Sequence, residues 1–273
     1  MKKKIHIKDK IDLEKIRLSG QAFRIRKSPE GSYRFICGGE VLDIIPEDLH
    51  TLSISCDEDK WREVWVPYFD LERSYDDIIK KSYGRHPYID KAIDCGRGLR
   101  ILKQNPWEML ITFIISQRKS IPAIASAVEA ICKKYGSVSP ADEGLYLFPT
   151  PEQMANANGE ELSKCGLGYR VAYVLDAIER VYHREIDLKA LYTLDDDELL
   201  KELLEIKGVG IKVANCVALF AYGRMGCVPV DVHIANAIEK DCGGESPFSL
   251  FGDDAGIIQQ YVFYHQKHRG EPG

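Results

Sequence analysis

The hydrophobic and polar positions between about Ala22 and Cys56 alternate in short segments. The segments read AFRIRK, YRFICG and EVLDIIP, and the spacers SPEG and GG separate them. Alternation with a period of two is typical of strands, and Gly, Pro and Ser in short spacers are typical of hairpin turns. This part of the chain therefore predicts an antiparallel sheet, with a helix or two across one of its faces.

The pattern becomes helical after Tyr68, and most clearly from Asn105. The segment NPWEMLITFIIS places Asn105 as an N-cap, Pro106 at the first helical position and Glu108 three residues after the cap. This helix is apolar nearly all round, so we expect it to be central. Further helices are predicted from Ser120 to Gly136, from Thr150, and from the turn CGLGY to about His183.

The change of pattern predicts an α+β fold with two domains. Residues 1–97 would form an antiparallel α+β domain, and residues 98–273 would form a helical domain. A chain of 273 residues is long enough to bury a sizeable core in one large domain or two smaller ones. Its 45% hydrophobic and 29% charged residues are typical of a globular protein.

Charge and cysteine content narrow the classes of function. The net charge of −5 excludes a protein coated in positive charge but allows a local basic surface. The eight cysteines contain no C-x-x-C pair, so we expect no zinc or iron–sulfur site. The basic N-terminus lacks the apolar core of a secretory signal, and no segment approaches the roughly 18 apolar residues of a membrane span. We therefore expect a cytoplasmic protein.

Two helical segments, TLDDDELLKELLEI and IKVANCVALFAYG, flank the short stretch KGVG. Thr193 is the predicted N-cap of the first helix. Two helices joined by Gly-Val-Gly form a helix-hairpin-helix, and the N–H groups that begin its second helix suit a DNA phosphate. The pattern predicts DNA contacts from Lys207, Gly208, Val209 and Gly210. The alternative is a tight helical turn with no ligand.

Two charged residues beyond this turn have both an ordinary and a catalytic interpretation. Lys212 is the second residue of the second helix, where its charge faces the positive end of the helix dipole. A lysine amine is also a nucleophile that forms Schiff bases. Asp231 precedes the helical segment VHIANAIEK, so its ordinary role is an N-cap. Backbone N–H groups hold a capping carboxylate still, as stabilisation of a developing cation requires.

These residues resemble the helix-hairpin-helix superfamily of DNA base-excision glycosylases and, within it, the 8-oxoguanine DNA glycosylases. The resemblance spans nearly the whole chain and includes SGQAFR, YFDLERSYDDIIKK, GLRILKQNPWEMLITFIIS, GLGYRVAYV and VPVDVH. It implies a TBP-like antiparallel domain in front of a helical glycosylase domain. It also implies that Lys212 attacks C1′ of a flipped nucleotide and that Asp231 stabilises the oxocarbenium-like state. The implied activities are those of a DNA glycosylase and AP lyase.

The resemblance further implies a pocket for the damaged base. Phe263 and Cys216 would sandwich the purine ring, and Gln259 would bond to its Watson–Crick edge. The carbonyl of Gly20 would accept from the N7–H that 8-oxoguanine has and guanine lacks. Without the resemblance, Phe263 would be interpreted as a core residue, Gln259 as a surface residue and Gly20 as part of a turn.

Other residues are matched to contacts with double-stranded DNA. Tyr169 matches an aromatic wedge in the base stack, Arg170 a basic group at the opposite strand, and His233 a phosphate contact. The alternatives are a turn aromatic for Tyr169 and a structural histidine for His233.

The chain departs from the family's eukaryotic pattern in the segment SQRKSIPAI. Arg118 stands at the position of an asparagine, and Ala123 at that of an arginine that reads the orphaned cytosine. We therefore expect relaxed discrimination of the opposite base, with Gln117 and Arg118 contacting the void or the opposite strand.

Two other functions stay open. The segment ISQ also resembles the alkylpurine branch of the superfamily. This resemblance predicts a monofunctional 3-methyladenine-type glycosylase that acts through Asp231 and water. The second is a helix-hairpin-helix protein that binds DNA without chemistry. Lys212 together with Cys216 and Gln259 favours 8-oxoguanine. We expect a monomer that acts on damaged duplex DNA at the nucleoid, with no membrane contact and no cofactor, although the family allows a monovalent cation at the hairpin carbonyls.

Overall fold

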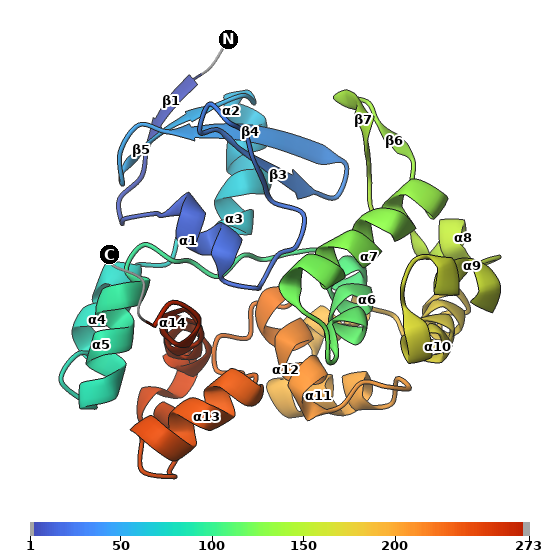
Figure 1. The fold of residues 1–273 in the computed structure, drawn as a ribbon. Coiled ribbons are helices and arrows are strands. Elements are labelled where there is room, and N and C mark those ends of the chain that lie inside the picture. Colours follow the sequence, from blue (N-terminus) through green and yellow to red (C-terminus); the bar gives the residue numbers. More distant parts are fainter. Residues whose placement is uncertain (1–2, 270–273) are drawn as a thin grey trace. The chain divides into compact units, whose positions relative to one another are not determined.

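The computed structural model describes residues 3–269 (Figure 1). The chain forms two compact units. The first comprises Met1–Phe35, Leu42–Lys103 and Gly223–Gly273, and the second comprises Ile36–Val41 and Gln104–Tyr222. A sheet with helices in the first unit and a mainly helical second unit confirm the predicted α+β class. The units group the C-terminal segment with the sheet, whereas the predicted boundary between residues 97 and 98 separates them. That boundary stays a prediction.

The first unit is built on a five-stranded sheet with the order β1-β5-β4-β3-β2. Its strands are β1 (Lys3–His6), β2 (Arg26–Lys27), β3 (Tyr33–Cys37), β4 (Glu40–Pro46) and β5 (Thr51–Ile54). The antiparallel sheet predicted for this segment is confirmed. The edge strand β1, which pairs Lys3 with Ile54, was not predicted because its exposed residues are mostly basic.

Helices complete the first unit (Figure 1). They are α1 (Leu13–Leu18), α2 (Glu58–Lys60), the π-helical turn Trp61–Trp65, α3 (Val66–Tyr68), α4 (Tyr75–Ser82), α5 (Pro87–Gly96), α13 (Val232–Asp241), the 3-10 segment Pro247–Asp254 and α14 (Ala255–Lys267). The helix across one face is confirmed, since Phe35 of the sheet packs edge-on against Phe69, with ring centroids 4.9 Å apart. Helix α14 approaches α5 closely at Gly96, where an added Cβ would lie 2.5 Å from the ring of Tyr261.

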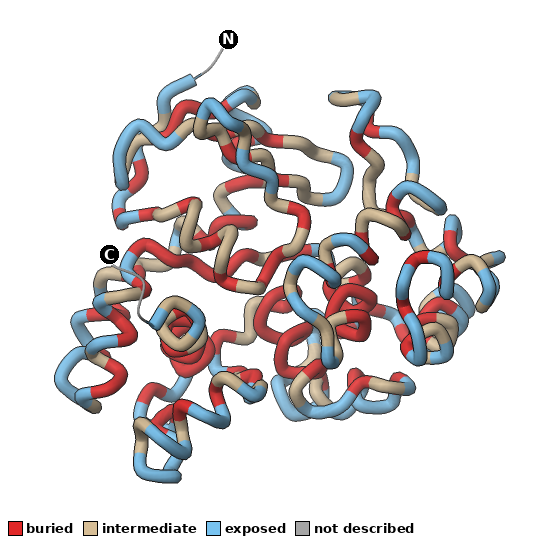
Figure 2. Tube along the Cα trace, in the orientation of Figure 1, coloured by how far each residue is buried: buried red, intermediate tan, exposed pale blue. Residues whose placement is uncertain are grey.

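The second unit surrounds the apolar helix α6. Its elements are α6 (Pro106–Ser116), α7 (Ile121–Tyr135), β6 (Val138–Ser139), β7 (Asp142–Tyr146), α8 (Pro151–Met154), α9 (Gly159–Lys164), the 3-10 turn Gly168–Arg170, α10 (Val171–Tyr182), the 3-10 turn Ala190–Thr193, α11 (Asp196–Leu204) and α12 (Ile211–Phe220). Asn105 caps α6 as predicted, accepting from the Glu108 N–H at 3.1 Å. Figure 2 shows α6 and α12 as largely buried, and Phe113 stacks on Phe220 between them. The central position predicted for α6 is confirmed.

One predicted cap is wrong. The N-cap of α11 is Asp195, whose carboxylate accepts from the Glu198 N–H at 2.9 Å. Thr193 instead ends the preceding 3-10 turn, and its hydroxyl donates to the carbonyl of Ala190. Both residue types are good caps, so the sequence pattern alone did not decide between them.

A buried guanidinium holds together the loop that follows α3. Arg100 is 1% exposed, and it donates to the carbonyls of Phe69, Asp70 and Arg73. Its guanidinium also lies 4.0 Å from the centre of the Tyr75 ring. Without this side chain, three carbonyls would lose their donor in an interior that water does not reach.

We expect Arg100→Met to lower the free energy of unfolding by about 3–5 kcal/mol, because it removes the buried cation that lies 3.8 Å from the buried carboxylate of Asp9. For a protein of this size, the corresponding fall in Tm is roughly 6–20 °C. The matched control is Arg62→Met, since Arg62 pairs with Asp59 one helical turn away, both side chains are exposed, and such pairs contribute little. Calorimetry that finds the same Tm for both variants would contradict this account.

Candidate active site

The helix-hairpin-helix predicted from KGVG is present in the second unit between α11 and α12. Gly208 has φ of +82°, a left-handed conformation that favours glycine. The ring of Tyr173 lies directly against it, and an added Cβ would be 2.3 Å from a ring carbon. Val209 is buried and donates its N–H to the carbonyl of Ile206. The turn is therefore tight and packed on α10.

The N-terminus of α12 is open to a ligand. Gly210 is its N-cap and supplies no side-chain hydrogen bond. The first residue, Ile211, is 61% exposed, and no side chain caps the first-turn N–H groups. Lys207 is exposed beside them, and its own N–H is bonded to Asp176. Backbone N–H groups and the helix dipole make such an end a site for an anion such as phosphate.

Lys212 is the second residue of α12, as predicted. It is half-buried, and its Nζ lies 5.4 Å from the centre of the Phe113 ring. Cys216 is one turn further along the same helix and is buried. Phe113 was missed in the sequence because one aromatic residue in an apolar helix carries no signal that it lies beside a lysine.

Hydrogen bonds connect the loop after α6 to the helix-hairpin-helix. Gln117 donates its Nε2 to the carbonyls of Ile114 and Gly208, both at 3.0 Å. Arg118 follows in an exposed position with φ of +51°. Lys119 donates to the carbonyl of Gly166, and burial, with a smaller effect of the Arg170 charge, lowers its pKa.

The turn before α10 presents Tyr169 and holds the same loop. Tyr169 is 55% exposed, and its predicted contact with DNA stays a prediction. Arg170 is buried, stacks on the Tyr169 ring at 4.3 Å, and donates through Nε to the carbonyl of Gln117 at 2.8 Å. These bonds give Arg170 a structural role, because they hold the loop after α6 in place. Its predicted contact with the opposite DNA strand stays a prediction.

A second group of predicted residues lies in the first unit around the start of α13. Asp231 is the N-cap, and its Oδ1 accepts from the N–H groups of His233 at 3.0 Å and Ile234 at 2.9 Å. The His233 ring meets the Phe263 ring edge-on, with centroids 5.7 Å apart. Gln259 lies one turn before Phe263 on α14. The predicted phosphate contact, stacking residue and carboxylate are thus brought together.

Gly20 also belongs to the first unit and lies in a turn after α1. Its φ is +72°, and the flanking side chains fix the turn. Gln21 is buried, donates to the carbonyl of Arg100 at 2.9 Å and accepts from the N–H of Leu102 at 2.7 Å. The backbone at Gly20 is therefore held in place, as a carbonyl that reads a base would need to be.

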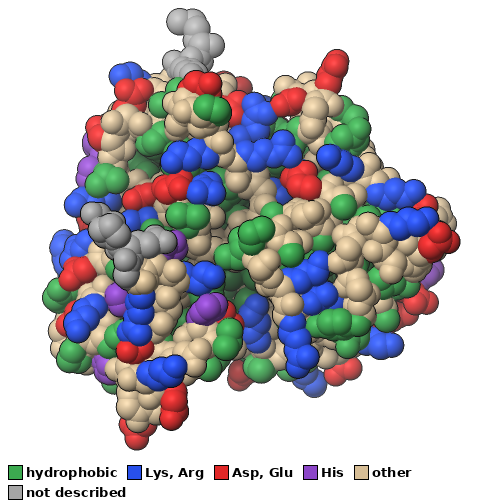
Figure 3. Space-filling view, in the orientation of Figure 1, with side chains coloured by type: hydrophobic (Ala, Val, Ile, Leu, Met, Phe, Trp, Pro, Cys, Tyr) green, Lys and Arg blue, Asp and Glu red, His purple; other side chains and the backbone are tan. Residues whose placement is uncertain are grey.

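The predicted residues fall into two sets. Lys212, Cys216 and the hairpin belong to the second unit, and Asp231, with the other predicted pocket residues, belongs to the first. Figure 3 shows basic side chains spread among acidic ones on the face in view, in keeping with the small net charge.

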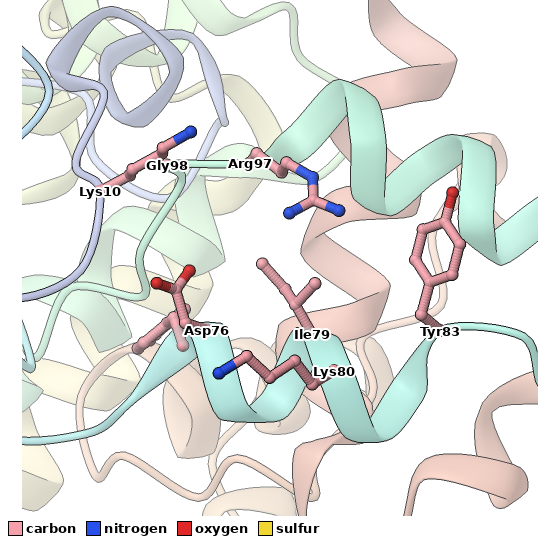
Figure 4. Close-up of a pocket in the computed structure, with 8 residues that line it drawn as sticks. Lys10, Asp76, Ile79, Lys80, Tyr83, Arg97 and Gly98 are labelled. Carbon is pink, nitrogen blue, oxygen red and sulfur yellow. The ribbon is translucent and has the colours of Figure 1, made fainter.

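A pocket of about 340 Å³ lies elsewhere in the first unit (Figure 4). It is lined by Lys10, Tyr75, Asp76, Ile79, Lys80, Tyr83, Arg97 and Gly98. Arg97 is already paired with Asp94, and Lys80 with Asp77. None of the predicted site residues lines this pocket, so we assign it no part in the reaction.

Within residues 3–269 no cluster of three or more His, Cys, Asp or Glu side chains is arranged to hold a metal ion. No helix in the same range is long and apolar enough to cross a membrane.

Two family models match consecutive parts of the chain. The model described as "8-oxoguanine DNA glycosylase, N-terminal domain" matches residues 4–110, and that described as "HhH-GPD superfamily base excision DNA repair protein" matches residues 111–247. The second match places the chain in the helix-hairpin-helix superfamily of base-excision DNA repair proteins, in agreement with the fold and the hairpin. Within this superfamily, the chain belongs to the 8-oxoguanine DNA glycosylase family.

Individual relatives agree with this assignment. The solved structure of MBOgg1 in complex with a low-affinity DNA ligand has a TM-score of 0.92 and 33% identity, covering 99% of this chain and 96% of that one. The Clostridium acetobutylicum 8-oxoguanine glycosylase/lyase in complex with DNA containing cytosine opposite 8-oxoguanine has a TM-score of 0.88 and 30% identity, covering 98% of each chain.

Curated relatives match shorter stretches. An N-glycosylase/DNA lyase of Saccharomyces cerevisiae is 32% identical over 158 residues, which are 53% of this chain and 42% of that protein. The chain therefore spans less than half of the yeast relative. Proteins named as 3-methyladenine glycosylases match about half of the chain at 23% and 26% identity, so they are more distant.

The hairpin offers a matched pair of glycine substitutions. We expect Gly208→Ala to lower the free energy of unfolding by about 1–3 kcal/mol, because its left-handed φ and the Tyr173 ring both oppose a Cβ. Gly210→Ser should change it by less than about 0.5 kcal/mol, because serine is a good N-cap and no atom lies within 4 Å of an added Cβ. Denaturant titration measures both values, and equal losses would show that the Tyr173 contact does not define the turn.

Proposed function

We propose that this protein excises 8-oxoguanine from duplex DNA and then cleaves the strand at the resulting abasic site. The observation that carries the proposal is the position of Lys212 in the first turn of α12, directly after a glycine hairpin whose helix end is uncapped. A phosphate bound by that helix end would place DNA within reach of the lysine amine. Membership of the 8-oxoguanine glycosylase family supports the substrate.

Lys212 supplies the nucleophile. Its amine attacks C1′ of the flipped nucleotide, the new C–N bond forms as the glycosidic bond breaks, and the base leaves with the electron pair and is protonated. The C1′–O4′ bond then breaks as the nitrogen of Lys212 loses a proton and forms a C=N bond, O4′ takes up a proton, and the ring-opened sugar is held as a Schiff base. Loss of a 2′ proton from that Schiff base breaks the 3′ C–O bond by β-elimination. The face of Phe113 borders the lysine, so part of its surroundings is apolar.

Asp231 supplies the fixed negative charge. Positive charge grows on the sugar as the base leaves, and a carboxylate nearby stabilises it most when it does not have to reorganise. Two backbone N–H groups hold Oδ1 of Asp231 in place, and neither of these two bonds involves Oδ2. The cap and the catalytic role therefore belong to the same side chain.

The roles of the residues that read the base are assigned by resemblance to the family. Phe263 and Cys216 stack on the purine, and Gln259 bonds to its Watson–Crick edge. Gly20 accepts from N7–H of the oxidised base. Buried polar groups that match one base strongly reject a base lacking the matching group.

The contacts with DNA divide between hairpin and loop. Lys207, Gly208, Val209 and Gly210 contact the backbone, and His233 contacts a phosphate; Tyr169 enters the base stack, with Gln117 and Arg118 beside it. Ala123 is exposed and has no group that reads a cytosine, so tolerance of different opposite bases is part of the proposal. The proposal also includes a monovalent cation bound by the hairpin carbonyls, and action in the cytoplasm at the nucleoid.

The monofunctional alkylpurine glycosylase is the competing function. It would use Asp231 and water alone, and it would form no covalent intermediate. Lys212, Cys216 and Gln259 would then have no function in the pocket, and the relatives named for 3-methyladenine are the more distant ones. A protein that only binds DNA would need none of these residues.

Borohydride trapping tests the lysine. Incubation with an 8-oxoguanine duplex and borohydride should give a covalent protein–DNA adduct, because reduction fixes the Schiff base. Lys212→Gln should give none, whereas Lys201→Gln, an exposed lysine of α11, should give the same amount as the unchanged protein. Excision by the unchanged protein without any adduct would support the monofunctional alternative.

Asp231→Asn tests the carboxylate separately from the cap. Asparagine caps as well as aspartate, so the free energy of unfolding should change by less than about 0.5 kcal/mol. The single-turnover excision rate should fall by about 10²–10³-fold, because the charge that stabilises the transition state is lost. Asp195→Asn, at the cap of α11, is the control and should leave the rate unchanged. An Asp231→Asn enzyme that excises at the normal rate would remove Asp231 from the mechanism.

A further inference from the structure

Two buried polar side chains lie on either side of Gly20 in the turn after α1. Ser19 and Gln21 are both 0% exposed, although serine and glutamine are usually surface residues. Their side chains bond to each other across the glycine, with Nε2 of Gln21 donating to Oγ of Ser19 at 2.9 Å. Oγ of Ser19 in turn donates to the carbonyl of Ile16, in the last turn of α1, at 2.7 Å. A hydrogen-bonded bridge therefore spans the residue whose carbonyl is proposed to read the base.

The Gln21 side chain is also bonded to the backbone of a neighbouring segment. Its Nε2 donates to the carbonyl of Arg100 at 2.9 Å, and its Oε1 accepts from the N–H of Leu102 at 2.7 Å. A backbone carbonyl can only accept and a backbone N–H can only donate, so turning the amide over would lose both bonds. The orientation of the Gln21 amide is thus fixed by partners that cannot turn over with it.

The segment that holds Gln21 is itself fixed in the core of the first unit. Ile101 is 0% exposed, and its N–H donates to the hydroxyl of Tyr75 at 3.0 Å. The side chain of Arg100 donates to the carbonyl of Phe69 at 3.0 Å. The bridge therefore connects the Gly20 turn to a buried, hydrogen-bonded part of the same unit.

Gly20 needs such support because glycine restricts its own backbone least. Its φ of +72° follows the helix C-cap Ser19, at a position where glycine commonly ends a helix. Glycine adopts other backbone angles at little steric cost, and rotation about them would turn its carbonyl away. Within residues 3–269 that carbonyl accepts no hydrogen bond, so no partner of its own holds its direction. Ending a helix explains the glycine, but it does not require a buried glutamine beside it.

We propose that Gln21 is a positioning residue that holds the Gly20 carbonyl in the direction that accepts from N7–H of 8-oxoguanine. It thereby contributes to the selection of 8-oxoguanine over guanine, whose N7 is an acceptor and carries no hydrogen. The Gln21 side chain is fully buried, so it acts through the backbone of Gly20 and does not touch the base. This inference rests on the proposed function, in which Gly20 reads the flipped base.

The test compares two reactions of the same protein that differ in their need for Gly20. One is single-turnover excision of 8-oxoguanine, and the other is strand cleavage at a preformed abasic site, where there is no base to read. Gln21→Met replaces the amide by an apolar side chain of similar length. We expect its excision rate to fall about tenfold and its abasic-site cleavage to stay within about twofold of the original, because only excision uses the Gly20 hydrogen bond. Both rates are measured well below the Tm of the variant, which the lost hydrogen bonds will lower.

Ser19→Ala is the milder variant, and it tests the proposal even if Gln21→Met does not fold. It removes the bridge across Gly20 and keeps the two backbone bonds of Gln21, so excision should fall about threefold relative to abasic-site cleavage. The matched control is Ser53→Ala in the sheet. Ser53 is 6% exposed, and its hydroxyl donates to Glu47 at 2.6 Å. This control should leave the ratio of the two rates unchanged, whatever its effect on the Tm.

Binding measures the selection against guanine directly. Lys212→Gln protein, which lacks the nucleophile, should bind a duplex with 8-oxoguanine more tightly than one with guanine at the same position. Adding Gln21→Met should lower that ratio of affinities about tenfold.

Three results would overturn the positioning role and leave the proposed function intact. They are excision and abasic-site cleavage that fall together in Gln21→Met or Ser19→Ala, rates that both stay unchanged, and a ratio of affinities that Gln21→Met does not alter. If the unchanged protein excises no 8-oxoguanine, the proposed function fails and this inference fails with it.

Discussion

The turn between α11 and α12 depends on the contact between Gly208 and the ring of Tyr173. The left-handed backbone at Gly208 and the ring beneath it leave no room for a side chain. After this turn Gly210 is the N-cap of α12, no side chain caps the first-turn N–H groups, and Lys212 lies in the first turn. Gln117 bonds to the Gly208 carbonyl and connects the turn to the end of α6. The candidate phosphate site and the candidate nucleophile are therefore positioned by one local constraint.

In the first unit, Asp231 combines a structural role with a candidate catalytic role. Its carboxylate satisfies two N–H groups at the start of α13, which is an ordinary structural role, and those bonds also fix the position of its charge. His233 and Phe263 pack against each other on α13 and α14. Sites built on helices are held more accurately than sites on free loops. A structural and a catalytic role for Asp231 thus do not compete.

Helix α14 shows where the sequence departs from what stability alone would favour. Two adjacent amides, Gln259 and Gln260, lie in a largely apolar interior, and one of their carbonyl oxygens has no partner among the described residues. Natural sequences depart from good packing and complete hydrogen bonding most often at functional sites. The buried pair is consistent with a base-reading function, in which polar groups are kept dry for a substrate that will bond to them.

The sequence by itself determined the local features of this protein. The cap at Asn105, the glycine hairpin and the cap at Asp231 depend on residues within one or two helical turns, so periodicity and capping rules predicted them correctly. The tertiary structure alone decided which distant side chains meet. Phe113 lies beside the candidate lysine, Arg170 is buried against the loop carbonyl of Gln117, and Gln259 donates to the carbonyl of Pro229. Such contacts depend on how helices pack and on which rotamers the packing allows, and neither is written in the spacing of residues along the chain.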